Sequence, residues 1–153
     1  MVKIICAAMM ITMFSGCNLR TWLNNFTSKE KATTSIKELK NVTSLENEKQ
    51  FTKFVANPKP TIVMVHSTWC SSCKIMEPIF SKLADELNDA KCGIINLDQA
   101  PELAKKYLLS GVPVFLVFQN GTELSKPETR PIGDMSLDNL RQKIDEVFSE
   151  FHS

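Results

Sequence analysis

Two kinds of hydrophobic pattern recur along the chain, and each predicts a different secondary-structure element. Apolar runs at 61–65, 93–97 and 114–118 predict strands. The first run shows no alternation with polar residues, which is typical of a strand buried on both faces of a sheet. Apolar residues spaced three or four apart predict one amphipathic helix after Cys70 and another after Ser136, which is placed to cap it.

The N-terminal part of the domain has weaker signals. The stretch 36–42 is a candidate strand. Thr43 with Glu46 three residues later fits a capping box, which predicts that a helix begins there. The apolar side of this helix would consist of Leu45, Phe51, Phe54 and Val55.

Three further signals complete the order of elements. Pro101 stands at the start of a short helix within 98–107. Pro78 lies inside the long central helix, and we expect it to kink that helix rather than end it. Asn120-Gly121 predicts a hairpin, so that a last strand returns within 122–132. The order β-α-β-α-β-α-β-β-α predicts an α/β fold with a central mixed sheet and helices on both faces.

Composition and charge exclude several classes of protein. With 153 residues, 43% of them hydrophobic and 23% charged, the chain has the length and apolar content of one folded domain. The net charge of +1 gives no overall field that would attract nucleic acid, so we expect no nucleic-acid partner. Five cysteines are too few for a small scaffold stapled by disulfides.

Residues 1–16 have the pattern of a bacterial export signal. Lys3 is their only charged residue, and the apolar run at 4–14 is shorter than the ~20 residues of an ordinary membrane-spanning helix. Ser15-Gly16-Cys17 resembles a bacterial lipoprotein box, although Phe14 stands where that box usually has Leu. We therefore expect cleavage before Cys17, which would carry the lipid as the first mature residue. An ordinary signal or an uncleaved anchor is the alternative.

The rest of the chain divides into two segments. Residues 17–35 are polar with few large apolar side chains, which predicts a tether between the membrane and the domain. Residues 36–153 contain all the predicted strands and helices, and we expect them to form the folded domain.

The candidate chemistry lies at Cys70 and Cys73, two thiols separated by two residues at a strand-to-helix junction. In the first turn of a helix, free N–H groups and the positive end of the dipole favour the thiolate form of Cys70, the nucleophile of disulfide exchange. Cys73 would lie on the same face one turn deeper, where it can attack a mixed disulfide. Two alternatives stay open: a permanently oxidised structural disulfide, and a zinc site completed by Cys92 and His66.

The sequence resembles the thioredoxin family from about Ile36 to the C-terminus. The residues that carry this resemblance are Trp69-Cys70-Ser71-Ser72-Cys73-Lys74, Pro78, Asn96-Leu97-Asp98, Gly111-Val112-Pro113, Phe118-Gln119-Asn120-Gly121 and Gly133. The resemblance implies a thioredoxin fold and dithiol–disulfide exchange without a metal or organic cofactor. It also implies that Cys70 is the attacking thiol and Cys73 the resolving thiol.

The resemblance further implies a substrate-binding surface beside the cysteine pair. Pro113 would follow a cis peptide bond and face the pair, and Val112 would offer its backbone groups to an extended peptide. Trp69 would be an exposed rim on which partner proteins dock. The alternatives are a Pro113 that only opens the next strand and a Trp69 that packs in the core.

The sequence departs from the family pattern beneath the cysteine pair. Typical members bury an Asp six residues before the first Cys and a Lys near it on the next strand, but Met64 and Ile94 occupy these positions. Cys73 is then left without an obvious base, and the candidates are Glu77 and water.

Two further residues stand apart from the pattern. His66 replaces a Trp of the family; it is either a cation that lowers the pKa of Cys70 or a packing residue. Cys92 is expected to be a small buried hydrophobe, with a regulatory or dimer-forming thiol as the alternative.

These observations predict a membrane-tethered thiol–disulfide oxidoreductase in the bacterial periplasm or at the cell surface. Its partners would be protein thiols and disulfides and a membrane electron donor, and the compact chain favours the reductase or isomerase direction. One alternative is a thioredoxin-like peptide-binding or assembly module with incidental redox activity. Another is a metal-delivery protein that uses Cys70, Cys73 and His66.

Overall fold

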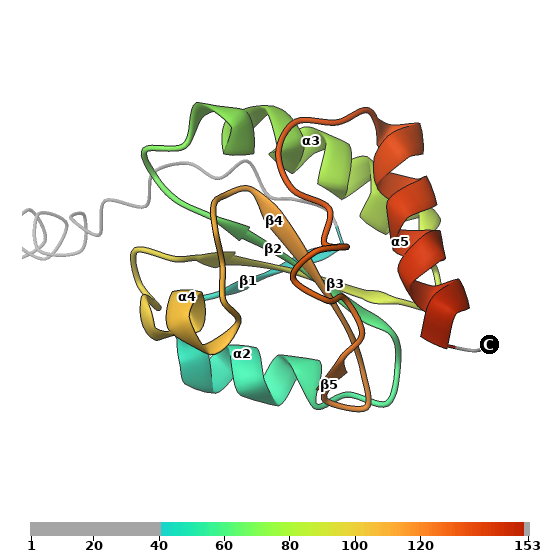
Figure 1. The fold of residues 1–153 in the computed structure, drawn as a ribbon, viewed down its shortest axis with the longest axis horizontal. Coiled ribbons are helices and arrows are strands. Elements are labelled where there is room, and N and C mark those ends of the chain that lie inside the picture. Colours follow the sequence, from blue (N-terminus) through green and yellow to red (C-terminus); the bar gives the residue numbers. More distant parts are fainter. Residues whose placement is uncertain (1–40, 152–153) are drawn as a thin grey trace, which may run out of the picture. The chain divides into compact units, whose positions relative to one another are not determined.

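The computed structural model describes residues 41–151, and these form a sheet enclosed by helices (Figure 1). In chain order the elements are β1 (Val42–Leu45), α2 (Glu48–Val55), β2 (Thr61–His66), α3 (Ser71–Glu86), β3 (Lys91–Asn96), α4 (Glu102–Lys106), β4 (Val114–Gln119), β5 (Thr122–Glu123) and α5 (Leu137–Phe151). The predicted export signal at 1–16, the predicted lipid-bearing Cys17 and the predicted tether at 17–35 lie outside the described residues. Within the described part, no helix has both the length and the apolar content needed to cross a bilayer.

The five strands lie in the order β1-β3-β2-β4-β5. Strands β1, β3 and β2 are parallel, whereas β4 runs antiparallel to β2 and pairs with β5 in a hairpin. The parallel strands are connected through helices α2 and α3, and the β4–β5 pair is connected through a tight turn. Strand β4 also follows a helix, α4, but runs antiparallel to β2. The predicted central mixed sheet with helices on both faces is therefore confirmed.

Each face of the sheet carries its own hydrophobic core. Helices α3 and α5 cover one face and α2 and α4 cover the other (Figure 1). Along β2, Ile62 and Met64 pack toward α3 and α5, while Val63 and Val65 belong to the opposite core. This two-sided burial explains why the strand contains an apolar run without alternation.

The predicted end of the first strand at residue 42 and the predicted cap at Thr43 are wrong, whereas residues 36–40 of that predicted strand lie outside the described residues. The strand β1 spans Val42–Leu45, so Thr43 lies inside it and Leu45 is buried against the sheet. The helix begins later, because the side chain of Asn47 caps it by accepting a hydrogen bond from the backbone N–H of Gln50 at 3.0 Å. A short apolar segment is ambiguous between strand and helix, and pairing of β1 with β3 decided it.

Helix α3 continues through Pro78 to Glu86, as predicted, with the proline on its exposed side. Ile75, Ile79 and Leu83 have the four-residue spacing that predicts the apolar side of this helix, but Ile75 is exposed and so does not belong to that side. The residues of α3 that face the core are Cys73, Met76, Phe80, Leu83 and Ala84. At 3.6 residues per turn, position 75 falls on the opposite side of the helix from this set.

The remaining elements follow their sequence signals. Asn120 and Gly121 both have positive φ, 51° and 80°, as a tight hairpin turn between β4 and β5 requires. After β5, the returning chain pairs with β4 again through an isolated antiparallel β-bridge between Ile132 and Val114. Helix α5 begins after Ser136, whose hydroxyl accepts a hydrogen bond from the backbone N–H of Asn139 at 3.2 Å.

Candidate active site

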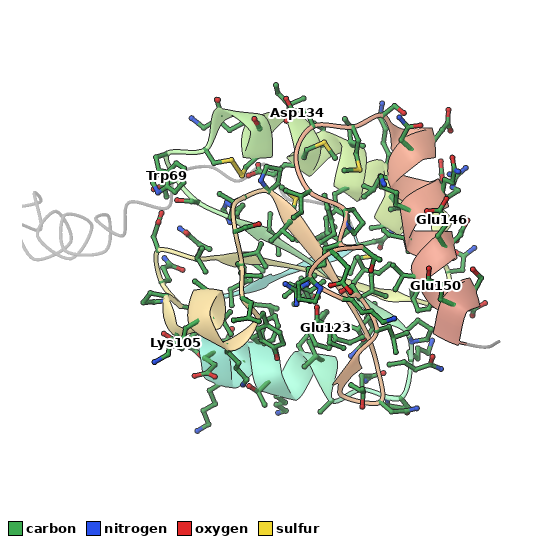
Figure 2. All side chains as sticks on the ribbon, viewed as in Figure 1. Trp69, Lys105, Glu123, Asp134, Glu146 and Glu150 are labelled. Atoms are coloured by element: carbon green, nitrogen blue, oxygen red, sulfur yellow. A yellow bond between two sulfur atoms is a disulfide. The ribbon has the colours of Figure 1, made fainter. Side chains whose placement is uncertain are left out.

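Cys70 and Cys73 form a disulfide at the N-terminal end of α3. Figure 2 shows this yellow S–S bond close to Trp69, at the edge of the molecule. Cys70 is the N-cap of the helix, and its Sγ accepts a hydrogen bond from the backbone N–H of Cys73 at 3.1 Å. The Cys70 sulfur therefore occupies the position where free N–H groups and the helix dipole favour a negative charge.

Cys70 lies at the start of α3 because the chain turns from the end of β2 directly into this helix. The strand ends at His66, and a turn follows in which the backbone N–H of Cys70 donates to the carbonyl oxygen of Ser67 at 3.2 Å. Cys73, one turn into α3, is fully buried, whereas Cys70 retains a small exposed area. Cys70 is therefore the more accessible cysteine of the pair.

The Val112–Pro113 peptide bond is cis, as the resemblance implies. Strand β4 begins directly after it, and its pairing with β2, Val114 opposite Val65, brings this loop to the same end of the sheet as the cysteines. The carbonyl oxygen of Val112 lies 3.6 Å from Cys70 Sγ. The structure thus places Cys70, Val112 and Pro113 together.

Trp69 is 75% exposed, so the alternative that it packs in the core is wrong. Its indole Nε1 donates a hydrogen bond to the Asp98 carboxylate at 3.3 Å. Asp98 also accepts hydrogen bonds from the hydroxyl of Ser67 at 2.7 Å and from the backbone N–H and hydroxyl of Thr68 at 3.0 and 2.7 Å. These bonds, with that from the Thr68 backbone the largest cause, lower the pKa of Asp98 to about 2.

Sequence reasoning gave Asp98 no role at the site. It follows β3, which is parallel to β2, so the ends of both strands lie at one edge of the sheet. A carboxylate directly after a neighbouring parallel strand was the available signal, because it can reach the loop that precedes Cys70. Its partners could not be read from the sequence, because the conformation of that loop decides which donors meet it.

Met64 and Ile94 are direct neighbours on β2 and β3, and both are buried. The core beneath the cysteine pair is therefore apolar at the two positions where the family that the sequence resembles typically has an Asp and a Lys. His66 lies at the end of β2, 8% exposed, and its Nδ1 is 3.8 Å from Oε1 of Glu77 on α3. Burial lowers the pKa of His66 below 6.5, with Asp98 opposing, so its ring is neutral at pH 7 and is not a cation for Cys70.

Cys92 is the free cysteine of the described residues, and it is buried on β3. Burial raises its pKa to about 12, which confirms the prediction of a small buried hydrophobe. Among residues 41–151, no three His, Cys, Asp or Glu side chains are grouped as ligands of a metal ion would be. Neither the zinc set nor the metal-delivery set considered from the sequence is therefore assembled.

Comparison with known proteins agrees with this geometry. The sequence model of the thioredoxin family matches residues 42–146. A thioredoxin of Mycoplasma genitalium is 33% identical over 108 residues, which cover 71% of this chain and 98% of that protein. Thioredoxin-1 of Saccharomyces cerevisiae is 29% identical over 85 residues, which cover 56% and 82% of the two chains.

Solved structures show the same fold. Thioredoxin from Trypanosoma brucei brucei superposes with a TM-score of 0.62 at 23% identity, covering 75% of this chain and 97% of that one. Oxidised mitochondrial thioredoxin 3 from Saccharomyces cerevisiae gives 0.61 at 23% identity, covering 71% and 97%. The chain therefore belongs to the thioredoxin family of thiol–disulfide oxidoreductases, and it carries the cysteine pair of that family at Cys70 and Cys73.

Proposed function

We propose that this protein is a membrane-tethered oxidoreductase outside the cytoplasm that reduces or isomerises disulfides of exported proteins. The observation that carries its chemistry is the placement of Cys70 Sγ. This sulfur accepts the backbone N–H of Cys73 at the start of α3 and lies 3.6 Å from the carbonyl oxygen of Val112, beside a cis proline.

Cys70 is proposed to be the attacking thiol. In the reduced protein its thiolate attacks one sulfur of a substrate disulfide, a mixed disulfide forms, and the other substrate sulfur leaves as a thiolate. Cys73 then attacks Cys70 Sγ, which closes the Cys70–Cys73 bond and releases the second substrate sulfur. The two electrons of the dithiol have then passed to the substrate, and no metal or organic cofactor takes part.

Trp69, Val112 and Pro113 are proposed to bind the substrate. The exposed indole of Trp69 offers a large amphipathic surface, which is typical of residues that anchor protein partners. An extended peptide beside Val112 would place its own sulfur near Cys70, because the Val112 carbonyl oxygen already contacts that sulfur.

The cellular place of the protein is proposed from its N-terminal pattern. Residues 1–16 resemble an export signal, Cys17 is placed to receive a lipid, and the polar residues 17–35 suit a tether. A tethered reductant would then require a membrane electron donor to return Cys70 and Cys73 to the thiol form.

A redox titration tests the proposed direction. The full chain is equilibrated in glutathione buffers, alkylated, and the peptide that contains Cys70 and Cys73 is analysed by mass. A midpoint near ~−270 mV supports a reductant, and one near ~−180 mV supports an isomerase. A midpoint near ~−120 mV, typical of strong oxidants, contradicts the proposed direction. A pair that never exchanges contradicts the enzymatic role and favours the peptide-binding module.

A labelling experiment tests the anchor separately. Cells that express the chain or its Cys17→Ala variant are fed an alkyne-labelled fatty acid and then fractionated. We expect label and membrane association in the original chain and the loss of both in the variant. Unlabelled protein, or a variant that stays at the membrane, contradicts lipidation of Cys17.

A further inference from the structure

The proposed reaction requires Cys73 to lose a proton in an apolar place. Its side chain is fully buried and packs in the core cluster that also contains Met64, Ile94 and Phe115. Burial of this kind raises the pKa of a thiol, because it disfavours the charged form. Attack on the mixed disulfide therefore needs a nearby group that accepts the proton.

Two titratable side chains meet beneath α3 without a role in the reaction described so far. Glu77 lies four residues after Cys73, so both side chains are on the same face of the helix, about 5–6 Å apart at Cβ. His66 ends β2 and, by strand alternation, faces the same side as Met64, toward α3. The 3.8 Å between His66 Nδ1 and Glu77 Oε1 shows that the two groups lie side by side.

We propose that Glu77 accepts the proton of Cys73 during resolution of the mixed disulfide and that His66 is its positioning residue. This inference rests on the proposed function, because it assigns a partner to the resolving thiol. The Sγ–H bond of Cys73 breaks, and its proton passes to Glu77 directly or through one water. Cys73 Sγ bonds to Cys70 Sγ, the bond from Cys70 to the substrate breaks, and the substrate sulfur leaves with the electron pair.

The surroundings of Glu77 suit a proton acceptor. Burial raises its pKa above 4.5, which brings a carboxylate closer to the pKa of a thiol, and Lys74 on the same helix opposes this shift. His66 faces it from β2 and is itself under the influence of Asp98. The other residues that line this side of the sheet, such as Ile94 on β3 and Phe115 on β4, are apolar.

The two steps of the reaction can be measured separately with dithionitrobenzoate, a small disulfide that releases a coloured thiolate. The reduced full chain carries Cys6→Ser and Cys17→Ser, and Cys92 is buried, so the thiols that react are Cys70 and Cys73. The first release reports attack by Cys70. The second release reports attack by Cys73 on the mixed disulfide, which is the step assigned to Glu77.

In Glu77→Gln we expect the second release to slow at least tenfold at pH 7 and to regain the original rate as pH rises toward 9. Hydroxide then replaces the missing carboxylate. The first release stays within twofold of the original. Glu77→Asp restores part of the rate, and His66→Asn slows the second release less than Glu77→Gln does. Glu86→Gln, a carboxylate change at the far end of α3, serves as the matched control and leaves both releases unchanged.

Two outcomes overturn the inference. One is a Glu77→Gln chain whose second release keeps the original rate and pH profile. The other is a chain in which both releases slow equally, because this shows general damage to the site. Failure of the proposed function looks different, since the unsubstituted chain would then give no second release. If His66→Asn does not fold, Glu77→Gln decides alone, because Glu and Gln have the same shape.

Discussion

The indole Nε1 of Trp69 donates a hydrogen bond to the carboxylate of Asp98, 29 residues further along the chain. The same carboxylate accepts hydrogen bonds from Ser67 and Thr68, so one exposed side chain after β3 holds the whole loop that precedes Cys70. The rim of the site is therefore positioned by a residue that does not touch the cysteines. Removal of this carboxylate should therefore loosen both the loop that precedes Cys70 and the position of the Trp69 indole.

Asp98 is expected to stabilise the folded protein only while it is ionised. Its pKa is about 2 in the folded protein and 3.8 in the reference state, so its contribution is complete above pH 4 and is lost as pH falls from 3.8 toward 2. The urea midpoints of the original chain and Asp98→Asn should differ by a constant amount from pH 7 to 5. The difference should disappear near pH 2. Urea unfolding followed by circular dichroism tests this, and a constant difference at all pH values would contradict it.

Trp69→Ala is expected to slow reduction of a protein disulfide about tenfold, the effect of losing an anchor worth about 1.4 kcal/mol. Reduction of dithionitrobenzoate should change little, since that small molecule does not need the rim. Trp69→Phe is the matched variant, because it keeps an aromatic surface but loses the N–H that binds Asp98. The measurement compares the rates at which the reduced original chain, Trp69→Ala and Trp69→Phe reduce insulin and dithionitrobenzoate. Equal losses on both substrates would show that the ring supports the site rather than the partner.

The strands at the centre of the sheet could be predicted because burial on both faces leaves a clear signal. Residues 62–65 alternate between two cores, and every one of them is apolar. The start of the domain could not be predicted in the same way. Leu45 fits the apolar side of a helix as well as it fits a short strand, and only its neighbour β3, distant in sequence, selects the strand.

The cysteine pair was predictable because its spacing and its place after a buried strand define the chemistry. The groups that surround the pair depend on tertiary contacts. Nothing in the local sequence shows that Asp98 meets Trp69, or that His66 and Glu77 lie 3.8 Å apart. Sequence reasoning named His66 and Glu77 individually, but the charge state of the imidazole followed only from its burial.

His66 is expected to make the protein less stable as pH falls below 6.5. Its pKa is lowered in the folded state by burial, so the unfolded chain binds more protons in the window below 6.5. As pH falls from 7.5 to 5, the free energy of unfolding of His66→Gln should therefore decrease less than that of the original chain. Glu77 has the opposite sign because its pKa is raised, and the comparison is repeated in a Glu77→Gln background. If the free energies of unfolding of the two chains change equally with pH, the result contradicts a lowered pKa of His66.

Cys92 is expected to resist alkylation in the folded protein. Its thiol is buried and its pKa is raised to about 12, so almost no thiolate is present or reachable at pH 8. Iodoacetamide at pH 8 should label Cys92 only after the chain is unfolded in guanidinium. Mass analysis of the peptide that contains Cys92 measures this. Rapid labelling of the folded chain would show that the strand edge opens and that the thiol is available for regulation.

Arg130 and Glu123 form a buried ion pair that fixes the loop between β5 and α5. Arg130 makes two bonds to the Glu123 carboxylate, at 2.8 and 3.0 Å, and also donates to the carbonyl oxygen of Tyr107; the side chains are 4% and 18% exposed. Arg130→Ala removes the cation beside this carboxylate, which then keeps only the Ser125 hydroxyl as a donor, and should cost about 3–5 kcal/mol. Arg130→Met with Glu123→Leu should cost much less. Arg141→Ala, which breaks an exposed pair with Glu86, should cost under about 1 kcal/mol. Urea unfolding of the four chains measures these costs, and equal losses at both pairs would contradict the role of burial.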